Sequence, residues 1–312
     1  MISRARARLE ILGVAFLFST GGAAIKAVGF SSWQVASLRS GIAALAVWLF
    51  LPAARQLRRD KLAITLLVAV AYAATLVLFV LANRLTTAAN TIFLQSTAPL
   101  YILLLGPWLL KEPIVRRDLA FMAAVGLGMA FFFFGRQTTF ATAPDPVAGN
   151  ILAACSGITY AAMLLGLRWM GTTGGSPASA VALGNLFAFL VALPLALPIG
   201  RQGPVDWIIV TYLGVFQIGL AYAVLTRAIP HVPALETSLL LFIEPALNPL
   251  LAWAVHGEYP GPWALLGGTL IMAATGVKSW ADARRDRARP GGPAEPPSRQ
   301  AAEPSNSRAA ET

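Results

Sequence analysis

Charged residues are scarce in this chain. Asp, Glu, Lys and Arg together make up 12% of its 312 residues, while 57% are hydrophobic. A soluble globular domain averages about 25% charged and roughly 45–50% apolar residues. So little charge cannot cover the surface of a water-soluble protein of this length. The composition therefore excludes a soluble enzyme or binding domain and indicates an all-α membrane protein that spans the bilayer several times.

Cysteine and histidine are almost absent. The single cysteine, Cys155, excludes a disulfide framework, and it leaves the redox compartment undetermined. The two histidines, His231 and His256, fall at opposite ends of one apolar segment, and no spacing of His, Asp or Glu matches a metal site. No G-x-x-x-x-G-K-[ST] motif for ATP occurs. We expect no cofactor and no metal.

The chain is basic, with a formal net charge of +10. A nucleic-acid partner would call for a basic stripe with interleaved aromatic residues, but the cations are scattered through short polar segments and the C-terminal tail. Membrane orientation explains their distribution better, because cytoplasmic loops are enriched in Lys and Arg. The expected partners are therefore a lipid bilayer and a small-molecule substrate, and not a nucleic acid.

Ten apolar segments are long enough to cross a bilayer, which takes about 20 mostly apolar residues. The first follows a basic start, as a signal peptide would, but a further apolar segment comes almost at once, so we interpret it as a spanning helix. Residues 281–312 are polar and rich in Pro and Ala, and we expect a disordered tail there. The predicted spans are 9–28, 33–52, 62–82, 88–109, 118–135, 147–168, 177–199, 205–227, 234–256 and 261–280.

The cations also predict an orientation. With the N-terminus inside the cell, most Lys and Arg fall on the cytoplasmic side, including Arg4, Arg58, Arg116 and Lys278. Lys26 lies near the outer end of the first span, where its long side chain is expected to reach out to the membrane surface. The sequence predicts a cell (inner) membrane protein with both termini in the cytoplasm.

Two stretches of the chain echo each other. When IFLQSTAPLYILLLGPWLLKE (92–112) is aligned with LLLFIEPALNPLLAWAVHGE (239–258), Pro99 falls on Pro245 and Glu112 on Glu258. The match predicts two copies of a five-helix unit, residues 1–140 and 147–280, followed by the tail, 281–312. Because five is odd, the second copy enters the membrane from the opposite side, which gives an inverted repeat.

On these features the sequence resembles the EamA-type members of the drug/metabolite transporter superfamily. The resemblance covers about residues 9–280 and rests on ten helices in two halves, on the mid-helix "AP" and "EP" pairs, and on the turns LLKEP and VHGEYP. The family usually has Gly-Glu in both turns, so Lys111 is a departure. The resemblance implies a transporter of small organic metabolites.

Glu244 is the first candidate site residue. It lies about ten residues into its span, roughly 15 Å deep and near the centre of a ~30 Å hydrocarbon core. A charge there costs about 2.5–3.5 kcal/mol, so the side chain is expected to face the interior of the bundle. Its counterpart in the first copy is Ala98, so the repeat itself does not require an acid. Two interpretations remain open: a substrate or proton site, and a neutralised structural group.

Arg39, inside the second span, stays charged when buried and needs an acid or carbonyl groups around it. It is the nearest partner in depth for Glu244, although a structural clamp remains an alternative. Gln95 and Tyr101 flank Pro99, and Asn248 lies one turn beyond Glu244, so these three are also predicted to bind substrate.

Pro99 and Pro245 are predicted hinges. Each removes a ladder hydrogen bond and frees the carbonyl four residues before it, and the two prolines are expected to kink their helices toward a shared cavity near the centre of the bundle. Tolerated membrane prolines are the alternative. Small residues at one-turn spacing in 118–135 and 261–280 permit close helix packing, within the bundle or in a possible homodimer.

The function predicted from these features is secondary transport of small organic metabolites such as amino acids by alternating access, with export as the predicted direction. The alternatives from other classes are an intramembrane enzyme and a non-transporting membrane scaffold. An enzyme is disfavoured because no Ser or Cys has a histidine within obvious reach in the sequence. A scaffold would not need an inverted repeat.

Overall fold

The computed structural model describes residues 3–109, 116–134, 141–228, 231, 240–241 and 243–288. These residues form helices and connecting segments, without a β-strand among them. The elements are α1 (Arg4–Ser19), α2 (Gly21–Ala27), α3 (Ser32–Phe50), η1 (Pro52–Arg55), η2 (Arg59–Lys61), α4 (Leu62–Leu85), α5 (Ala88–Gln95), α6 (Ala98–Leu109), α7 (Arg116–Phe131), α8 (Pro146–Thr172), α9 (Pro177–Ala196), α10 (Pro204–Tyr212), η3 (Leu213–Leu220), α11 (Ala221–Ala228), α13 (Ile243–His256) and α14 (Pro262–Ala288).

Local sequence signals set where several helices begin. Ser31 and Gln34 form a capping box at the start of α3, and the side chains of Thr87 and Asp145 accept backbone N–H groups at the starts of α5 and α8. Proline occupies the first turn of α8, α9 and α10, where its missing N–H group leaves no hydrogen bond unmade. Between these signals the side chains are mostly apolar, and the helix satisfies its own backbone N–H and C=O groups. Such segments can therefore lie in lipid.

Seven helical segments within the described ranges are long and apolar enough to cross a membrane, so the chain is a multi-pass membrane protein. The other three predicted spans overlap α7, α13 and α14, which are helical but are not among those seven, and residues 234–239 and 242 of the ninth span lie outside the described ranges. Ten spans therefore remain a prediction. The seven segments are Ala5–Ala27, Ser32–Phe50, Arg59–Leu85, Ala88–Leu105, Pro146–Leu167, Pro177–Ala196 and Pro204–Leu225.

Three of the predicted spans are not uniform α-helices. The first is interrupted at Thr20, between α1 and α2, and the fourth at Ser96 and Thr97, between α5 and α6. The eighth contains η3, a π-helical segment. Such segments are frequent at functional sites because the extra residue changes which side chains face a neighbouring helix.

Of the two prolines predicted as hinges, Pro99 lies at the start of a helix, whereas Pro245 follows a gap in the described ranges, because residues 240–241 are helical and residue 242 lies outside them. Pro99 is the second residue of α6, directly after the interruption, and Pro245 is the third residue of α13. In a first turn the missing N–H group removes no ladder bond, so Pro99 begins a new half-helix instead of kinking a continuous one. Pro249, one turn further along α13, is the proline inside that helix.

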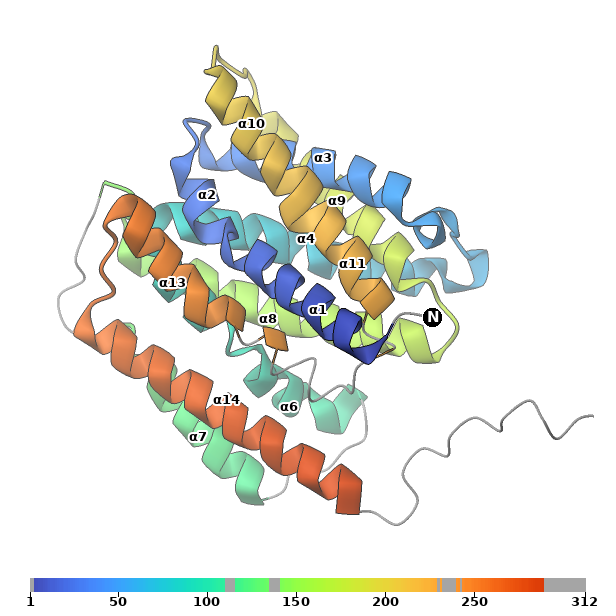
Figure 1. Ribbon diagram of the computed structural model, residues 1–312, viewed down its shortest axis with the longest axis vertical. Helices are drawn as coiled ribbons and strands as arrows, with labels where there is room; N and C mark the ends of the chain where they lie inside the picture. The colour runs from blue at the N-terminus through green and yellow to red at the C-terminus, as the bar shows by residue number, and fades with distance from the viewer. Residues whose placement is uncertain are drawn as a thin grey trace, which may run out of the picture.

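Helix α5 lies at the centre of the bundle, since all of its residues from Ala88 to Leu94 are buried. Around it, α4 packs against α8 and α9, α3 packs against α9, and α7 packs beside α14 at one edge (Figure 1). Helix α13 contacts α1, α2 and α5 with one face. On its opposite face Leu250 and Trp253 are exposed. The expected central position therefore holds for α5, whereas α13 has one face against the bundle and one face on the outside.

Glycine allows the closest of these contacts. A Cβ atom at Gly149 of α8 would lie 2.6 Å from the backbone nitrogen of Thr86, and one at Gly166 would lie 2.4 Å from Val68 of α4. Between α7 and α14, a Cβ at Gly267 would lie 2.5 Å from the carbonyl oxygen of Gly128. The small residues of the fifth and tenth spans therefore serve packing within the bundle at these positions.

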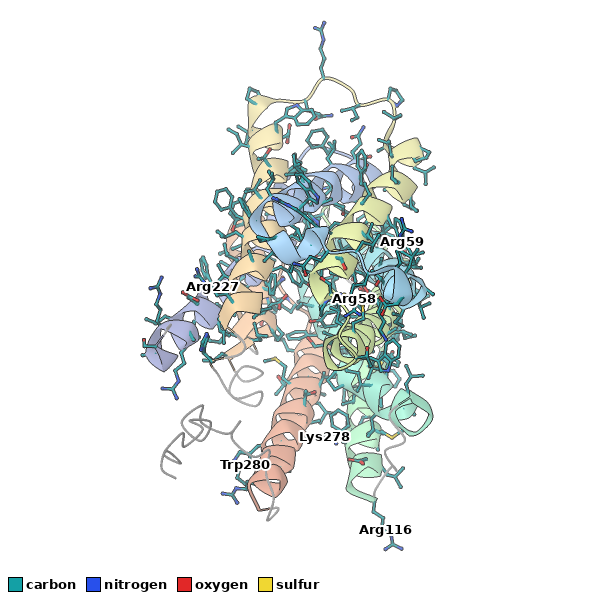
Figure 2. The ribbon with its side chains drawn as sticks, turned by 90° about the vertical axis from the view of Figure 1, so that its right-hand side faces the viewer. Arg58, Arg59, Arg116, Arg227, Lys278 and Trp280 are labelled. Atoms are coloured by element: carbon teal, nitrogen blue, oxygen red, sulfur yellow. The ribbon has the colours of Figure 1, made fainter. Side chains whose placement is uncertain are left out.

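The described cations are unevenly placed along the bundle. Figure 2 looks onto the end of the molecule that carries Arg58, Arg59, Arg116, Arg227 and Lys278. Helix α14 continues to Ala288, so the polar tail expected to start at 281 is helical for its first eight residues. Residues 289–312 lie outside the described ranges, as do Lys111 and Glu112.

The contact at Gly149 makes a test of the packing. Gly149→Ala would place a methyl group against backbone atoms that cannot move aside, and we expect a loss of about 1–3 kcal/mol of stability. Gly126→Ala on α7 is the control, because no atom lies within 4 Å of the added carbon and alanine favours the helix by about 1 kcal/mol. Melting temperatures of the two purified variants should therefore move in opposite directions. Equal melting temperatures would contradict the packing.

Candidate functional site

Arg39 is the most deeply buried cation of the predicted site. It lies on α3, and only 1% of its surface is exposed. Within the described part of the chain its Nε has no hydrogen-bond partner and no carboxylate pairs with it. Glycines in η3 bring the neighbouring helix close, since a Cβ at Gly214 would lie 2.9 Å from the carbonyl oxygen of Arg39. A buried guanidinium without an acid is costly, so Arg39 carries a burial cost that no described carboxylate offsets.

Two tyrosines lie close to Arg39. The side chains of Tyr72 and Tyr222 are hydrogen-bonded to each other, and both interact electrostatically with the guanidinium. Their ring centroids are 5.9 Å apart. Asn185 Nδ2 donates to the Tyr72 hydroxyl at 3.2 Å, while Asn185 Oδ1 has no partner among the described residues. The alignment that places Pro99 on Pro245 also places Arg39 on Asn185, and the fold brings these two side chains to one polar cluster.

Glu244 lies close to one of these tyrosines, Tyr222. It is the second residue of α13, is partly accessible, and interacts electrostatically with Tyr160 and Tyr222. Tyr222 is thus within reach of both Arg39 and Glu244. The predicted direct partnership of these two charges is not formed, since no ion pair joins Arg39 and Glu244.

Gln95 and Tyr101 flank the interruption between α5 and α6, where they contact α8. Gln95 Nε2 donates to Ser156 Oγ at 2.8 Å. A Cβ at Gly157 would lie 3.3 Å from the ring of Tyr101, so the glycine admits that ring. Ser156 and Tyr160 are one helical turn apart on α8, so the Gln95 contact and the tyrosine cluster occupy adjacent places on one helix face.

Asn248 lies one turn beyond Glu244 and is fully buried. Its side chain meets Gly22 of α2, where an added Cβ would be 2.4 Å from Asn248 Oδ1. Neither Nδ2 nor Oδ1 has a partner among the described residues, and the same is true of Gln217 Oε1 in η3, whose side chain meets Gly21. Unpaired buried amides are costly, so both are available for a polar ligand or water.

Lys26 forms a buried ion pair, which corrects the expectation that it reaches the membrane surface. Its Nζ lies 2.7 Å from Glu258 Oε1, and each side chain is 1% exposed. Lys26 also donates to the carbonyl oxygens of Thr86 and Thr142, at 2.7 and 2.6 Å. Three hydrogen-bonded partners satisfy the ammonium inside the protein, so it has no need to reach water.

Glu258 joins this ion pair to the central helix. Its Oε2 accepts the backbone N–H of Ala88, the first residue of α5, at 3.0 Å, and its Oε1 accepts the Thr142 hydroxyl at 2.5 Å. A carboxylate at a helix N-terminus is favoured by the helix dipole. The end of α2 is held in turn by Arg84, which donates to the carbonyl oxygens of Ile25, Val28 and Phe30.

Sequence reasoning missed two parts of the arrangement. The tyrosines at 72, 160 and 222 look like separate helix contacts in the sequence, and only the fold brings them together. Glu258 serves in the sequence only as an alignment marker, and its partner Lys26 lies in another half of the chain. The repeat of Pro and Glu at matched positions is the signal that could have drawn attention to Glu258. Within the described residues no group of three or more His, Cys, Asp or Glu is placed to hold a metal ion.

Comparisons with known proteins address the family. The model of the EamA-like transporter family matches residues 7–134 and 147–279. A comparison of the sequence with curated proteins gives no match. A solved structure titled "Crystal structure of protein" is 19% identical and has a TM-score of 0.60, with 91% of this chain and 99% of that chain covered, which shows a shared fold.

The two matched stretches together cover most of the chain and correspond to its two halves. The family is one of membrane transporters and not of enzymes. With its apolar helices and internal repeat, the chain belongs to the EamA-like transporter family of the drug/metabolite transporter superfamily.

Proposed function

We propose that this protein is a secondary transporter of small zwitterionic metabolites such as amino acids, which bind between Arg39 and Glu244. The observation that supports this most is a pair of opposite charges inside a membrane protein. Neither charge has an ion-pair partner among the described residues, and both lie within reach of Tyr222.

The chemistry of the two groups fits a zwitterion. The guanidinium of Arg39 presents a planar fork of donors that matches a carboxylate, and the carboxylate of Glu244 suits an ammonium group. Tyr160 and Tyr222, near Glu244, add ring faces that attract a cation and hydroxyls that donate or accept. A substrate with both charges would offset the burial cost of Arg39 and pair the partly accessible carboxylate of Glu244 at the same time.

The internal repeat supports alternating access. Repeat-related helices pack against each other, α3 on α9 and α7 on α14, and the contact of α4 with α9 is matched by the contact of η3 with α3. An odd number of helices in each half inverts the second half, and inverted repeats let one site near the midplane face either side in turn. We propose ten spans, with Gln95, Tyr101 and Asn248 at the same site and hinges beside Pro99 and Pro245.

We further propose that the ion pair of Lys26 and Glu258 closes the outer end of this pathway. The cation-rich end of the bundle in Figure 2 is taken as cytoplasmic, in keeping with the positive-inside tendency, with both termini there and the protein in the cell (inner) membrane. The ion pair joins the end of α2, the start of α5 and the segment after α13. With the outer end closed, the site would load from the cytoplasm, which favours export.

Glu244→Gln tests the substrate site. The amide keeps the size of the side chain but cannot pair with an ammonium group, so we expect the protein to fold and insert while uptake of a mixture of labelled amino acids into proteoliposomes falls roughly 10- to 100-fold. Its pH profile should change as well, because one ionisable group has been removed. Glu10→Gln, at the surface ion pairs with Arg6 and Arg227, is the matched control and should transport normally. Normal uptake and an unchanged pH profile in Glu244→Gln would exclude the site, and failure to fold would make Glu244 structural.

The ion pair of Lys26 and Glu258 predicts a pattern in three variants. Lys26→Met or Glu258→Gln alone leaves one buried charge unpaired and should cost about 3–5 kcal/mol, while the double variant should recover most of this stability. If the ion pair also closes the outer end, the double variant should open that end.

A cysteine at Ala252, buried on the inner face of α13, reports on this opening in a Cys155→Ser background. Its labelling by a membrane-impermeant maleimide from outside should rise in the double variant, whereas a cysteine at the exposed Gly200 should label equally in both backgrounds. Recovered stability with no rise at Ala252 would show that the pair holds the fold without acting as a gate.

A further inference from the structure

An apolar groove runs along the outside of the bundle, between α3 and α9. It has a volume of about 640 Å³ and is lined by Leu38, Leu45, Trp48, Leu57, Ala182 and Leu186, among others. Leu45 is 59% exposed and Trp48 is 48% exposed, so the groove faces the surroundings of the protein and not its interior. It is separate from Arg39 and Glu244, neither of which lines it.

One end of the groove carries a fixed positive charge. Arg55, in η1, is the charged residue of its lining. Arg55 Nε donates to the carbonyl oxygen of Trp48 at 3.0 Å, and its guanidinium carbon lies 4.5 Å from the centre of the Trp48 ring. These contacts hold the guanidinium at the end of α3, and no carboxylate among the described residues pairs with it.

More cations follow directly along the chain. Arg58, Arg59 and Lys61 lie in the segment that leads from η1 to α4, and Figure 2 shows Arg58 and Arg59 at the same end of the bundle. The acid of this segment, Asp60, is already paired with Arg58 at 3.1 Å. The end of the groove therefore carries an excess of positive charge, while most of the residues that line its walls are apolar.

The length of the groove matches one leaflet of a bilayer. From Leu38 to Trp48, α3 rises about 15 Å, and half of a ~30 Å hydrocarbon core has the same depth. An acyl chain lying in the groove would thus bring its headgroup to the level of Arg55. Basic pockets between helices at the cytoplasmic side of membrane proteins bind anionic headgroups through the same combination of contacts.

We propose that this groove is a binding site for one anionic phospholipid, with an acyl chain between α3 and α9 and the phosphate on Arg55. Phosphate oxygens match the guanidinium fork, and the neighbouring cations add attraction for a net negative headgroup. A zwitterionic lipid has the same acyl chains but no net charge, so it should bind more weakly.

Native mass spectrometry of the full-length protein tests the site, with phosphatidylglycerol and phosphatidylcholine as probes. We expect one phosphatidylglycerol to remain bound to the wild type at concentrations where phosphatidylcholine does not. Arg55→Gln should weaken this binding about tenfold or more, whereas Arg201→Gln, on an exposed cation outside the groove, should leave it unchanged. Inorganic phosphate at equal concentration should not displace the lipid, because it has no acyl chain to bury in the groove.

The acyl-chain half of the site has its own variants. Ala182→Phe and Ala44→Phe fill the groove from opposite walls. We expect at least one of these variants to keep the melting temperature of the wild type, and that variant should lose the bound lipid. Equal retention of phosphatidylglycerol in all variants would overturn the proposal, and so would full competition by inorganic phosphate. A wild-type dimer that Ala182→Phe dissociates, with no lipid bound, would assign the groove to a second copy of the chain instead.

Discussion

A bilayer contains no water that could solvate a charge or a free backbone group, and the ion pair of Lys26 and Glu258 is the strongest response to that constraint in the described structure. Lys26 donates hydrogen bonds to the carbonyl oxygens of Thr86 and Thr142, and Glu258 accepts a hydrogen bond from the first N–H of the central helix α5. Through these contacts four separate segments meet at one end of the bundle. Removing either charge would leave the other buried, so the whole end depends on both.

The same constraint supports the proposed substrate site. Charges in this fold are normally paired or held on carbonyl groups, as Arg84 is at the end of α2. Arg39 and Glu244 depart from that rule, since neither has an ion-pair partner within the described ranges and both interact electrostatically with Tyr222. Polar groups that the protein itself leaves unsatisfied are the ones a substrate can satisfy, which links the energetics of the fold to its proposed function.

Hydropathy located the helices well, because a stretch of about 20 apolar residues is typical of a helix that spans the bilayer. It could not locate the interruptions at Thr20 and Ser96 or the π-helical η3, since these depend on hydrogen bonds of side chains and neighbouring helices. The family followed from short motifs spread over both halves, and the family match confirms it. The partner of Lys26 and the tyrosine cluster are long-range contacts, and a single sequence carries no direct signal for such contacts.

The central claim is that Arg39 and Glu244 recognise the two charges of one substrate. The most direct measurement is uptake of a mixture of labelled amino acids into wild-type proteoliposomes, in competition with the corresponding amines, which lack the carboxylate, and N-acetyl derivatives, which lack the ammonium group. The account predicts that unlabelled amino acids compete and that both sets of analogues compete at least about tenfold more weakly, as expected when one charged contact is lost. Competition by the amines or the N-acetyl derivatives as strong as that of the amino acids would contradict it.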